Sequence, residues 1–190
     1  VQNFLANELP FREQSFDLIH VRFAVGWLKR AEWVLLLARC LVLLKPGGYV
    51  VMTEGEGIYT TSPALERLQE MLCAALHVSG YGLSLSPRFM GVVAHLGSLS
   101  AQTGLQQIET TVTLLDYSYS QEEANRAWRD SFHSFISESS LFLLQAGVTT
   151  TEELVQIDTR LLIEMYQEDF GGLGPLFTFS AQRPRGEGKE

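Results

Sequence analysis

Two glutamates, Glu54 and Glu56, lie at the end of the segment KPGGYVVMTEGEG (45–57). The proline and glycines that open this segment are typical of a turn that ends a helix. The apolar run that follows predicts a strand covered on both faces of a sheet. Two carboxylates after a buried strand indicate either a solvated loop or the rim of a cofactor or substrate pocket, and the segment alone leaves both explanations open.

Other residues that can do chemistry are expected where strands end, because ligands bind at the carboxyl ends of the strands in open α/β sheets. This rule selects three segments, 17–23, 54–57 and 116–119. The first of them contains His20 and Arg22. Three further histidines lie inside helical patterns, where ordinary surface or core positions are expected: His77, His95 and His133.

The composition argues against several other classes of function. The 190 residues are 46% apolar and carry a net charge of −8 without a basic stripe, which argues against a nucleic-acid partner. Cys40 and Cys73 have no second cysteine or histidine at metal-ligand spacing. We therefore expect no metal site and two buried, reduced thiols in a cytoplasmic protein. The longest apolar run, VLLLARCLVLL, is too short to cross a bilayer, so no membrane partner is expected.

Hydrophobic periodicity predicts the elements that must position these residues. Strands separated by helices indicate an α/β fold with a largely parallel sheet, in which the last two strands can pair antiparallel. The strands are expected at 16–20, 49–54, 105–118 and 175–184, and the helices at 29–45, 62–80, 86–104, 121–147 and 150–172.

Four polar residues mark expected helix starts. Ser62 and Ser86 each precede a proline, which suits the first turn of a helix. Ser120 and Thr150 are each followed three residues later by glutamate, which is the pattern of a capping box.

The segments ELPFREQSFDLIHVRF and LLARCLVLLKPGGYVVMTE together resemble the middle of class I S-adenosylmethionine-dependent methyltransferases of the small-molecule type. The resemblance covers residues 8–54, and GPLFTFSAQRP is similar to the family's terminal strand. It implies a partial Rossmann-like methyltransferase sheet, of which this chain supplies the last four strands, with helices and an inserted helical lid. The first three strands and the glycine-rich loop of the family would then lie outside this chain, so the fragment itself is expected to be inactive.

The resemblance also implies cofactor contacts. The position of the family's adenine-binding aspartate holds Leu5, with Ala6 and Asn7 beside it. Contacts there can come from the backbone of Ala6 and Asn7, or from the Asn7 side chain if the register is shifted. His20, Val21 and Arg22 would line the wall near the sulfonium, with Arg22 holding the cofactor's carboxylate or a neighbouring acid. An aspartate at the position of Asp17 more often holds the strand in place than takes part in the reaction.

Methyl transfer is an in-line displacement that needs proximity, and a general base helps only a hydroxyl or amine acceptor. The candidates for a catalytic base are His20, Glu54 and Glu56. An acceptor pocket under the helical lid would be shaped by aromatic side chains, although such a stripe is more often plain core: Tyr59, Tyr81, Phe89, Trp128, Phe132 and Phe135.

The expected function is S-adenosylmethionine-dependent methyl transfer to a small-molecule acceptor, within one partial domain over 1–182 followed by a frayed tail over 183–190. One alternative is a non-catalytic α/β module that binds a partner through its exposed sheet edge or helical insert, including a second copy of itself. Another is a different Rossmann-like enzyme, such as a nucleotide-binding oxidoreductase.

Overall fold

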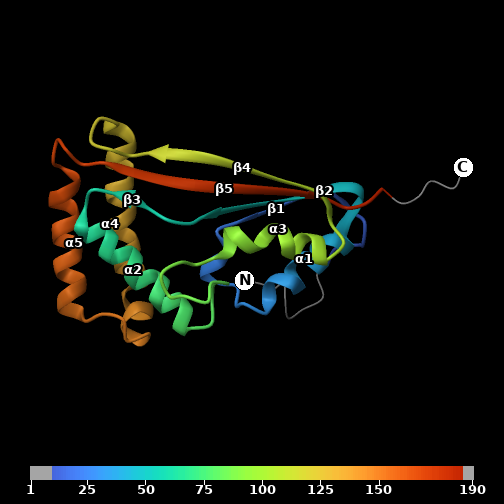
Figure 1. Ribbon diagram of the computed structural model, residues 1–190, viewed down its shortest axis with the longest axis horizontal. Helices are drawn as coiled ribbons and strands as arrows, with labels where there is room; N and C mark the ends of the chain where they lie inside the picture. Colours follow the sequence, from blue (N-terminus) through green and yellow to red (C-terminus); the bar gives the residue numbers. More distant parts are fainter. Residues whose placement is uncertain (1–9, 186–190) are drawn as a thin grey trace, which may run out of the picture.

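The predicted α/β class is confirmed by a computed structural model, which describes residues 10–185 (Figure 1). The four expected strands and five expected helices are present, together with a two-residue strand and a 3₁₀ turn, η1. The elements are β1 (Phe16–Arg22), η1 (Ala24–Gly26), α1 (Glu32–Leu43), β2 (Leu44–Gly55), β3 (Tyr59–Thr60), α2 (Pro63–Val78), α3 (Val92–Gln102), β4 (Gln106–Asp116), α4 (Glu122–Gln145), α5 (Thr151–Met165) and β5 (Gly172–Gln182).

The strands form one five-stranded sheet, in which β5 pairs with three of the other four strands. β1 pairs with β2 in parallel, whereas β2, β3 and β4 each pair antiparallel with β5. The first four strands therefore point the same way and only β5 runs against them. This arrangement brings the carboxyl ends of β1, β2 and β4 to one edge of the sheet. The antiparallel β4–β5 pair is one of the arrangements that the sequence left open, but β1–β2 is the only parallel pair among the described residues, so the sheet is less parallel than expected.

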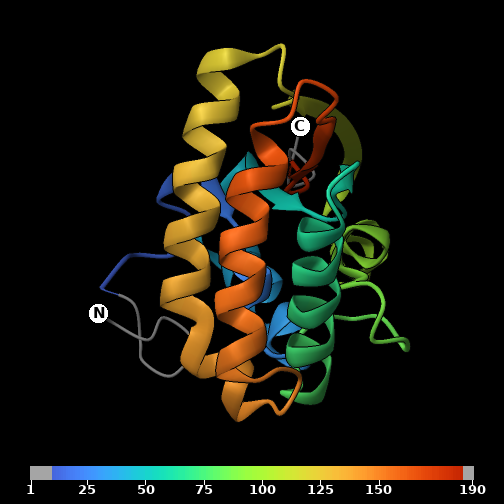
Figure 2. The same cartoon turned by 90° about the vertical axis from the view of Figure 1, so that its left-hand side faces the viewer.

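The hydrophobic core consists of two separate clusters. One lies between the sheet and the helices α1 and α3, and includes Trp33, Met52 and Phe179. The other joins α2, α4 and α5, which stand side by side at one end of the sheet, and includes Leu65 and Leu161 (Figure 2). The carboxyl ends of β1, β2 and β4 lie where the two clusters meet.

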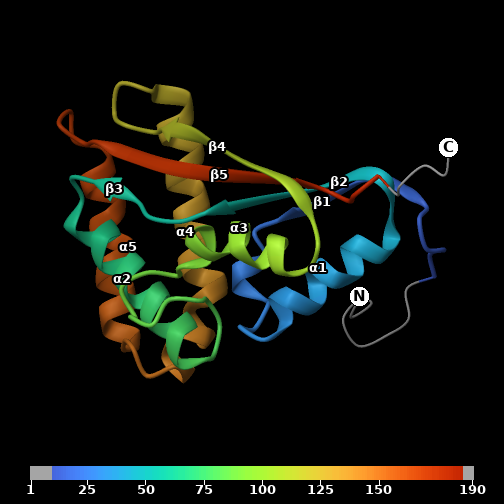
Figure 3. The same ribbon diagram turned by 45° about the vertical axis from the view of Figure 1, so that its right-hand side comes forward.

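Helices cover only one face of the sheet within the part of the chain that the structure describes. α1 and α3 lie beneath the strands, and no helix lies on the opposite face (Figure 3). Leu18 and Tyr49 are paired on neighbouring strands and remain 57% and 38% exposed. On the same face, Thr53 lies within hydrogen-bond distance of both His20 and Thr178, at 3.4 and 3.2 Å.

Two of the four expected helix starts are confirmed and two are wrong. The hydroxyls of Ser62 and Thr150 accept hydrogen bonds from backbone N–H groups three residues on, at the starts of α2 and α5. Ser120 caps nothing, because α4 begins one residue later than a capping box would place it, with Gln121 at its N-cap. Ser86 lies in a loop, because α3 begins only after Gly91.

α1 passes directly into β2, so the PGG segment, expected as a turn between helix and strand, lies within the first residues of β2, where the pairing with β1 is irregular. The helix ends at Leu43, and Gly47 adopts a φ of 81°, which favours glycine. Arg183, just after β5, donates from its guanidinium to the carbonyl oxygens of Leu41 and Leu44 at 2.8 and 2.7 Å, which satisfies the end of α1. Residues 186–190 of the expected tail lie outside the described residues.

Candidate functional site

Glu54 is buried, and its carboxylate is directed to the backbone of the segment that follows β1. It is 1% exposed and accepts hydrogen bonds from the N–H groups of Ala24 at 2.7 Å and Val25 at 3.5 Å. Burial raises the pKa of Glu54, and these two N–H groups partly oppose the rise. This carboxylate therefore fixes η1 against the end of β2.

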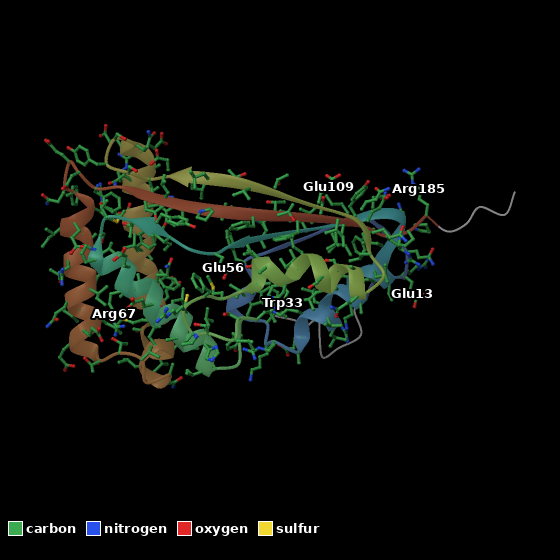
Figure 4. All side chains as sticks on the ribbon, in the orientation of Figure 1. Glu13, Trp33, Glu56, Arg67, Glu109 and Arg185 are labelled. Atoms are coloured by element: carbon green, nitrogen blue, oxygen red, sulfur yellow. The ribbon has the colours of Figure 1, made fainter. Side chains whose placement is uncertain are left out.

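Glu56 has a similar position at the start of another helix. Its two oxygens accept from the N–H groups of Gly91 and Val93, which open α3. A carboxylate suits this place, because the first N–H groups of a helix have no partner within it and form its positive end. Figure 4 labels Glu56 between the sheet and the helices below it. Both glutamates thus bind backbone donors that are distant in sequence.

The predicted residues of β1 divide between the two faces and the end of the strand. His20 is exposed on the uncovered face, with Nε2 3.4 Å from the hydroxyl of Thr53. Val21 is half-buried and faces the sheet core. Arg22 is exposed at the carboxyl end, where its guanidinium lies 5.3 Å from the ring centroid of Phe23. Asp17, at the other end, forms an exposed ion pair with Lys45 at 2.7 Å.

Phe23 has an unusual backbone conformation for a residue other than glycine. Its φ and ψ are 51° and 45°, in the left-handed region. The conformation is held by hydrogen bonds from its own N–H to the Thr53 carbonyl and from the Trp27 indole to its carbonyl, both 2.9 Å long. Such residues persist where the surroundings fix them, often beside binding sites. Here it ends β1 abruptly and turns the chain away from the sheet.

A cavity of about 470 Å³ opens at this edge of the sheet, between the strand ends and the helices α2 and α4. All three segments selected by the strand-end rule contribute to it, through Phe23, Gly55 and Tyr117 among others. Cavities of this size bind small organic molecules. The position agrees with the predicted acceptor pocket under a helical lid.

Half of the aromatic residues expected in the pocket line this cavity. Trp128, Phe132 and Phe135 on α4 do so. The other three, Tyr59, Tyr81 and Phe89, are not part of its lining. Glu54, Glu56 and His20 are also absent from the lining, whereas Arg22 belongs to it.

Sequence reasoning did not single out Tyr117 or Gln69 as pocket residues. Tyr117 is completely buried and its ring stacks on Trp128 at 4.9 Å between centroids. Its hydroxyl has no hydrogen-bond partner among the described residues, and burial raises its pKa. Tyr117 could have been identified from the sequence, because it lies in a segment that the strand-end rule selects. Gln69 lies inside a predicted helix, and nothing in the sequence marks it as a pocket residue.

Several predicted features concern absences or lie outside the described residues. Leu5, Ala6 and Asn7, the expected adenine contacts, fall outside residues 10–185. Within that range no cluster of histidine, cysteine, aspartate or glutamate is arranged to hold a metal ion. Cys40 and Cys73 are buried and free, as expected. None of the described helices combines the length and the apolar character needed to cross a membrane.

The solved structures that match this chain do so at low sequence identity. Phosphoethanolamine N-methyltransferase 2 of Haemonchus contortus matches at 19% identity and a TM-score of 0.44, over 92% of this chain and 35% of that one. The YcgJ protein of Bacillus subtilis matches at 16% identity and a TM-score of 0.43, over 93% of this chain and 68% of that one. The chain thus spans about a third of the length of the first. No match to a curated protein sequence was found.

The family model described as "Methyltransferase domain" matches residues 1–52. This region runs through β1 and α1 into β2 and contains the LPF, FD and PGG motifs. The resemblance expected from these motifs is therefore confirmed: residues 1–52 are similar to a methyltransferase domain.

Proposed function

We propose that this chain forms part of a domain that transfers a methyl group from S-adenosylmethionine to a small-molecule acceptor. The observation that carries the proposal is the apolar cavity at the carboxyl ends of β1 and β2. β1 lies wholly within the matched region, and most of β2 does. The helices α2 and α4 close it from the other side, which supports an enclosed acceptor site.

The cofactor is proposed to lie against the end of β1, beside His20, Val21 and Arg22, with Leu5, Ala6 and Asn7 completing the adenine contacts. The described residues fit a carboxylate-bearing cofactor at one point, because the exposed Arg22 forms no ion pair within the described residues and can bind a carboxylate. When bound, S-adenosylmethionine supplies the activated methyl group.

Proximity and orientation are proposed to provide most of the rate acceleration. Glu54 and Glu56 were candidate bases, but their oxygens accept backbone hydrogen bonds and lie outside the cavity lining. Their contribution in this proposal is to hold η1 and α3, and thereby the walls of the site. Of the three candidate bases, His20 has the most exposed side chain, so it can exchange a proton with solvent most readily.

A titration with S-adenosylhomocysteine tests the proposed cofactor site. We expect amide resonances of His20 to Phe23 to shift in ¹⁵N-labelled protein, with a dissociation constant weaker than about 100 μM because most cofactor contacts would lie elsewhere in the longer domain. Adenosine, which lacks the carboxylate, should leave Arg22 nearly unshifted. Unchanged spectra at millimolar S-adenosylhomocysteine would contradict the proposal.

The net charge and the state of the cysteines support two further parts of the proposal, the absence of a nucleic-acid partner and a cytoplasmic location. A net charge of −8 is unfavourable for nucleic-acid binding. Two buried, free cysteines suit a reducing compartment, and we propose a cytoplasmic location.

A second candidate function is association through the β1 edge. β1 pairs only with β2 among the described residues, so its outer backbone groups have no strand partner there. A groove of about 360 Å³ runs beside it, lined by Phe11, Leu18 and Leu36 among others. Open apolar edges of this kind pair with other chains. A second copy of this chain is the proposed partner.

Sedimentation velocity tests this association. We expect a concentration-dependent dimer, and Leu18→Lys should weaken it at least tenfold by placing a charge in the apolar contact. Val112→Lys is the matched control, because Val112 is 56% exposed on β4, at the far edge of the sheet. Equal weakening by both substitutions, or a monomer at all concentrations, would refute pairing through β1.

A further inference from the structure

The charge on the wall of the cavity is positive. Arg22 is its only charged lining residue within residues 10–185, and no carboxylate is found in the wall. An ammonium group would therefore enter an apolar site with a cation at its rim. Glu56 acts electrostatically on the lining residue Cys73, but it is not part of the wall and its oxygens already accept from the N–H groups of Gly91 and Val93. Burying an unpaired charge is strongly unfavourable, so the electrostatics disfavour cationic ligands.

The polar groups of the wall are mostly hydrogen-bond donors. The side-chain oxygen of Gln69 already accepts from the N–H of Ile58, while its amide nitrogen donates to no described residue. The Tyr117 hydroxyl is buried and has no hydrogen-bond partner among the described residues. Ser131, at the exposed rim, donates to the carbonyl of Ala127 at 2.8 Å. The proton of Ser131 is therefore already donated, whereas the Gln69 amide, the Tyr117 hydroxyl and the Arg22 guanidinium can offer protons to a ligand's oxygen atoms.

The aromatic residues do not form a cage for a quaternary ammonium. The rings of Tyr117 and Trp128 stack at 4.9 Å with 28° between their planes, and Trp128 lies 5.2 Å from Phe132. Ring faces engaged with one another are unavailable to surround a cation. A ligand would therefore contact the edges of these rings and the apolar side chains of Leu72 and Leu176.

Resting on the proposed function, we infer that the acceptor is an apolar, ring-bearing molecule, neutral or anionic. It presents oxygen atoms to Gln69 and to those of the five N–H groups of Arg22 that the cofactor's carboxylate does not occupy. Cationic amines are excluded from the cavity. The volume of about 470 Å³ suits a fused-ring compound better than a two-carbon amine.

Three naphthalene probes of the same shape but different charge test this ligand class. They are 2-naphthoate, 2-naphthol and 2-naphthylmethylammonium, titrated calorimetrically into the 190-residue chain. We expect naphthoate to bind with a dissociation constant on the order of 100 μM and the ammonium at least tenfold more weakly. Arg22→Gln should reduce naphthoate affinity to that of naphthol.

A matched pair of substitutions on α4 locates the binding. Ser131→Phe narrows the cavity and should weaken all naphthalene binding at least fivefold, whereas Ser134→Phe, at an exposed position outside the lining, should not. Thermal melting checks that each variant is folded. Equal affinity for naphthoate and the ammonium, no effect of Ser131→Phe, or no binding by the folded chain would overturn the inference.

The S-adenosylhomocysteine titration separates this inference from the proposed function. Loss of the cofactor response with a retained preference for naphthoate would refute the proposed reaction and leave the ligand class intact. The opposite result would refute the ligand class alone.

Discussion

Replacing Gly172 by alanine is expected to destabilise the protein by about 3 kcal/mol, because no space exists for a methyl group there. A Cβ at this position would lie 2.5 Å from Tyr117 Cδ2 and 2.9 Å from Phe170 Cζ. The Tyr117 ring cannot retreat, since it is completely buried and packs on Trp128. Urea denaturation followed by far-ultraviolet circular dichroism measures the loss.

Gly174→Ala is the matched control on the same strand. Its Cβ would meet the nearest Tyr117 atom at 3.5 Å, an ordinary contact, so a change of less than about 1 kcal/mol is expected. The double variant Gly172→Ala/Tyr117→Ala should lose less stability than the sum of the losses of the two single variants, because the added methyl group and the Tyr117 ring compete for one space. Equal costs for the two glycine substitutions would show that the Tyr117 ring is not fixed as described.

Glu54→Ala is expected to cost about 3 kcal/mol, the second large effect. The substitution leaves the N–H of Ala24 buried without its acceptor and creates a cavity beneath η1. Glu54→Gln retains an acceptor of the same shape, so we expect about 1 kcal/mol. Denaturant unfolding at pH 7 distinguishes the two.

The pH dependence of the Glu54→Gln difference has a defined sign. Because burial raises the native pKa of Glu54, the native state binds this proton more tightly than the unfolded state does. Stability due to Glu54 therefore falls as the pH rises from the unfolded pKa, about 4.3, through the raised native value. Wild type should gain stability relative to Glu54→Gln on acidification over that window.

Glu56→Ala serves as the comparison for this prediction. Glu56 is only half-buried and accepts from the first turn of α3, so its removal should cost about 1 kcal/mol, as for a helix cap. A larger loss for Glu56→Ala than for Glu54→Ala, or a Glu54→Gln difference that is flat with pH, would contradict the assigned roles.

The features that sequence reasoning predicted correctly are those determined by neighbouring residues. The α5 cap at Thr150 depends on residues within one helical turn, and the end of α1 depends on the PGG segment that follows it. The strand-end rule also located the cavity, because β1, β2 and β4 share a direction. These are local or topological properties that a single sequence contains.

The features that were missed depend on contacts between distant residues. The start of α3 is set by Glu56, 35 residues before Gly91, so Ser86 looked like the better start. The burial of Glu54 depends on a segment 30 residues earlier folding back across β2. An acid at a strand end therefore looked like a base or a solvated residue, when its partners are backbone N–H groups.

The division of the core into two clusters has an evolutionary consequence. Trp128 and Phe135 line the cavity and pack against the helical cluster alone, whereas Met52 and Phe179 belong to the cluster beneath the sheet. Changes in the first pair alter the cavity wall without disturbing the second. Sequence drift in α4 can therefore change the shape of the cavity among descendants, while the strands above the other cluster evolve under a separate constraint.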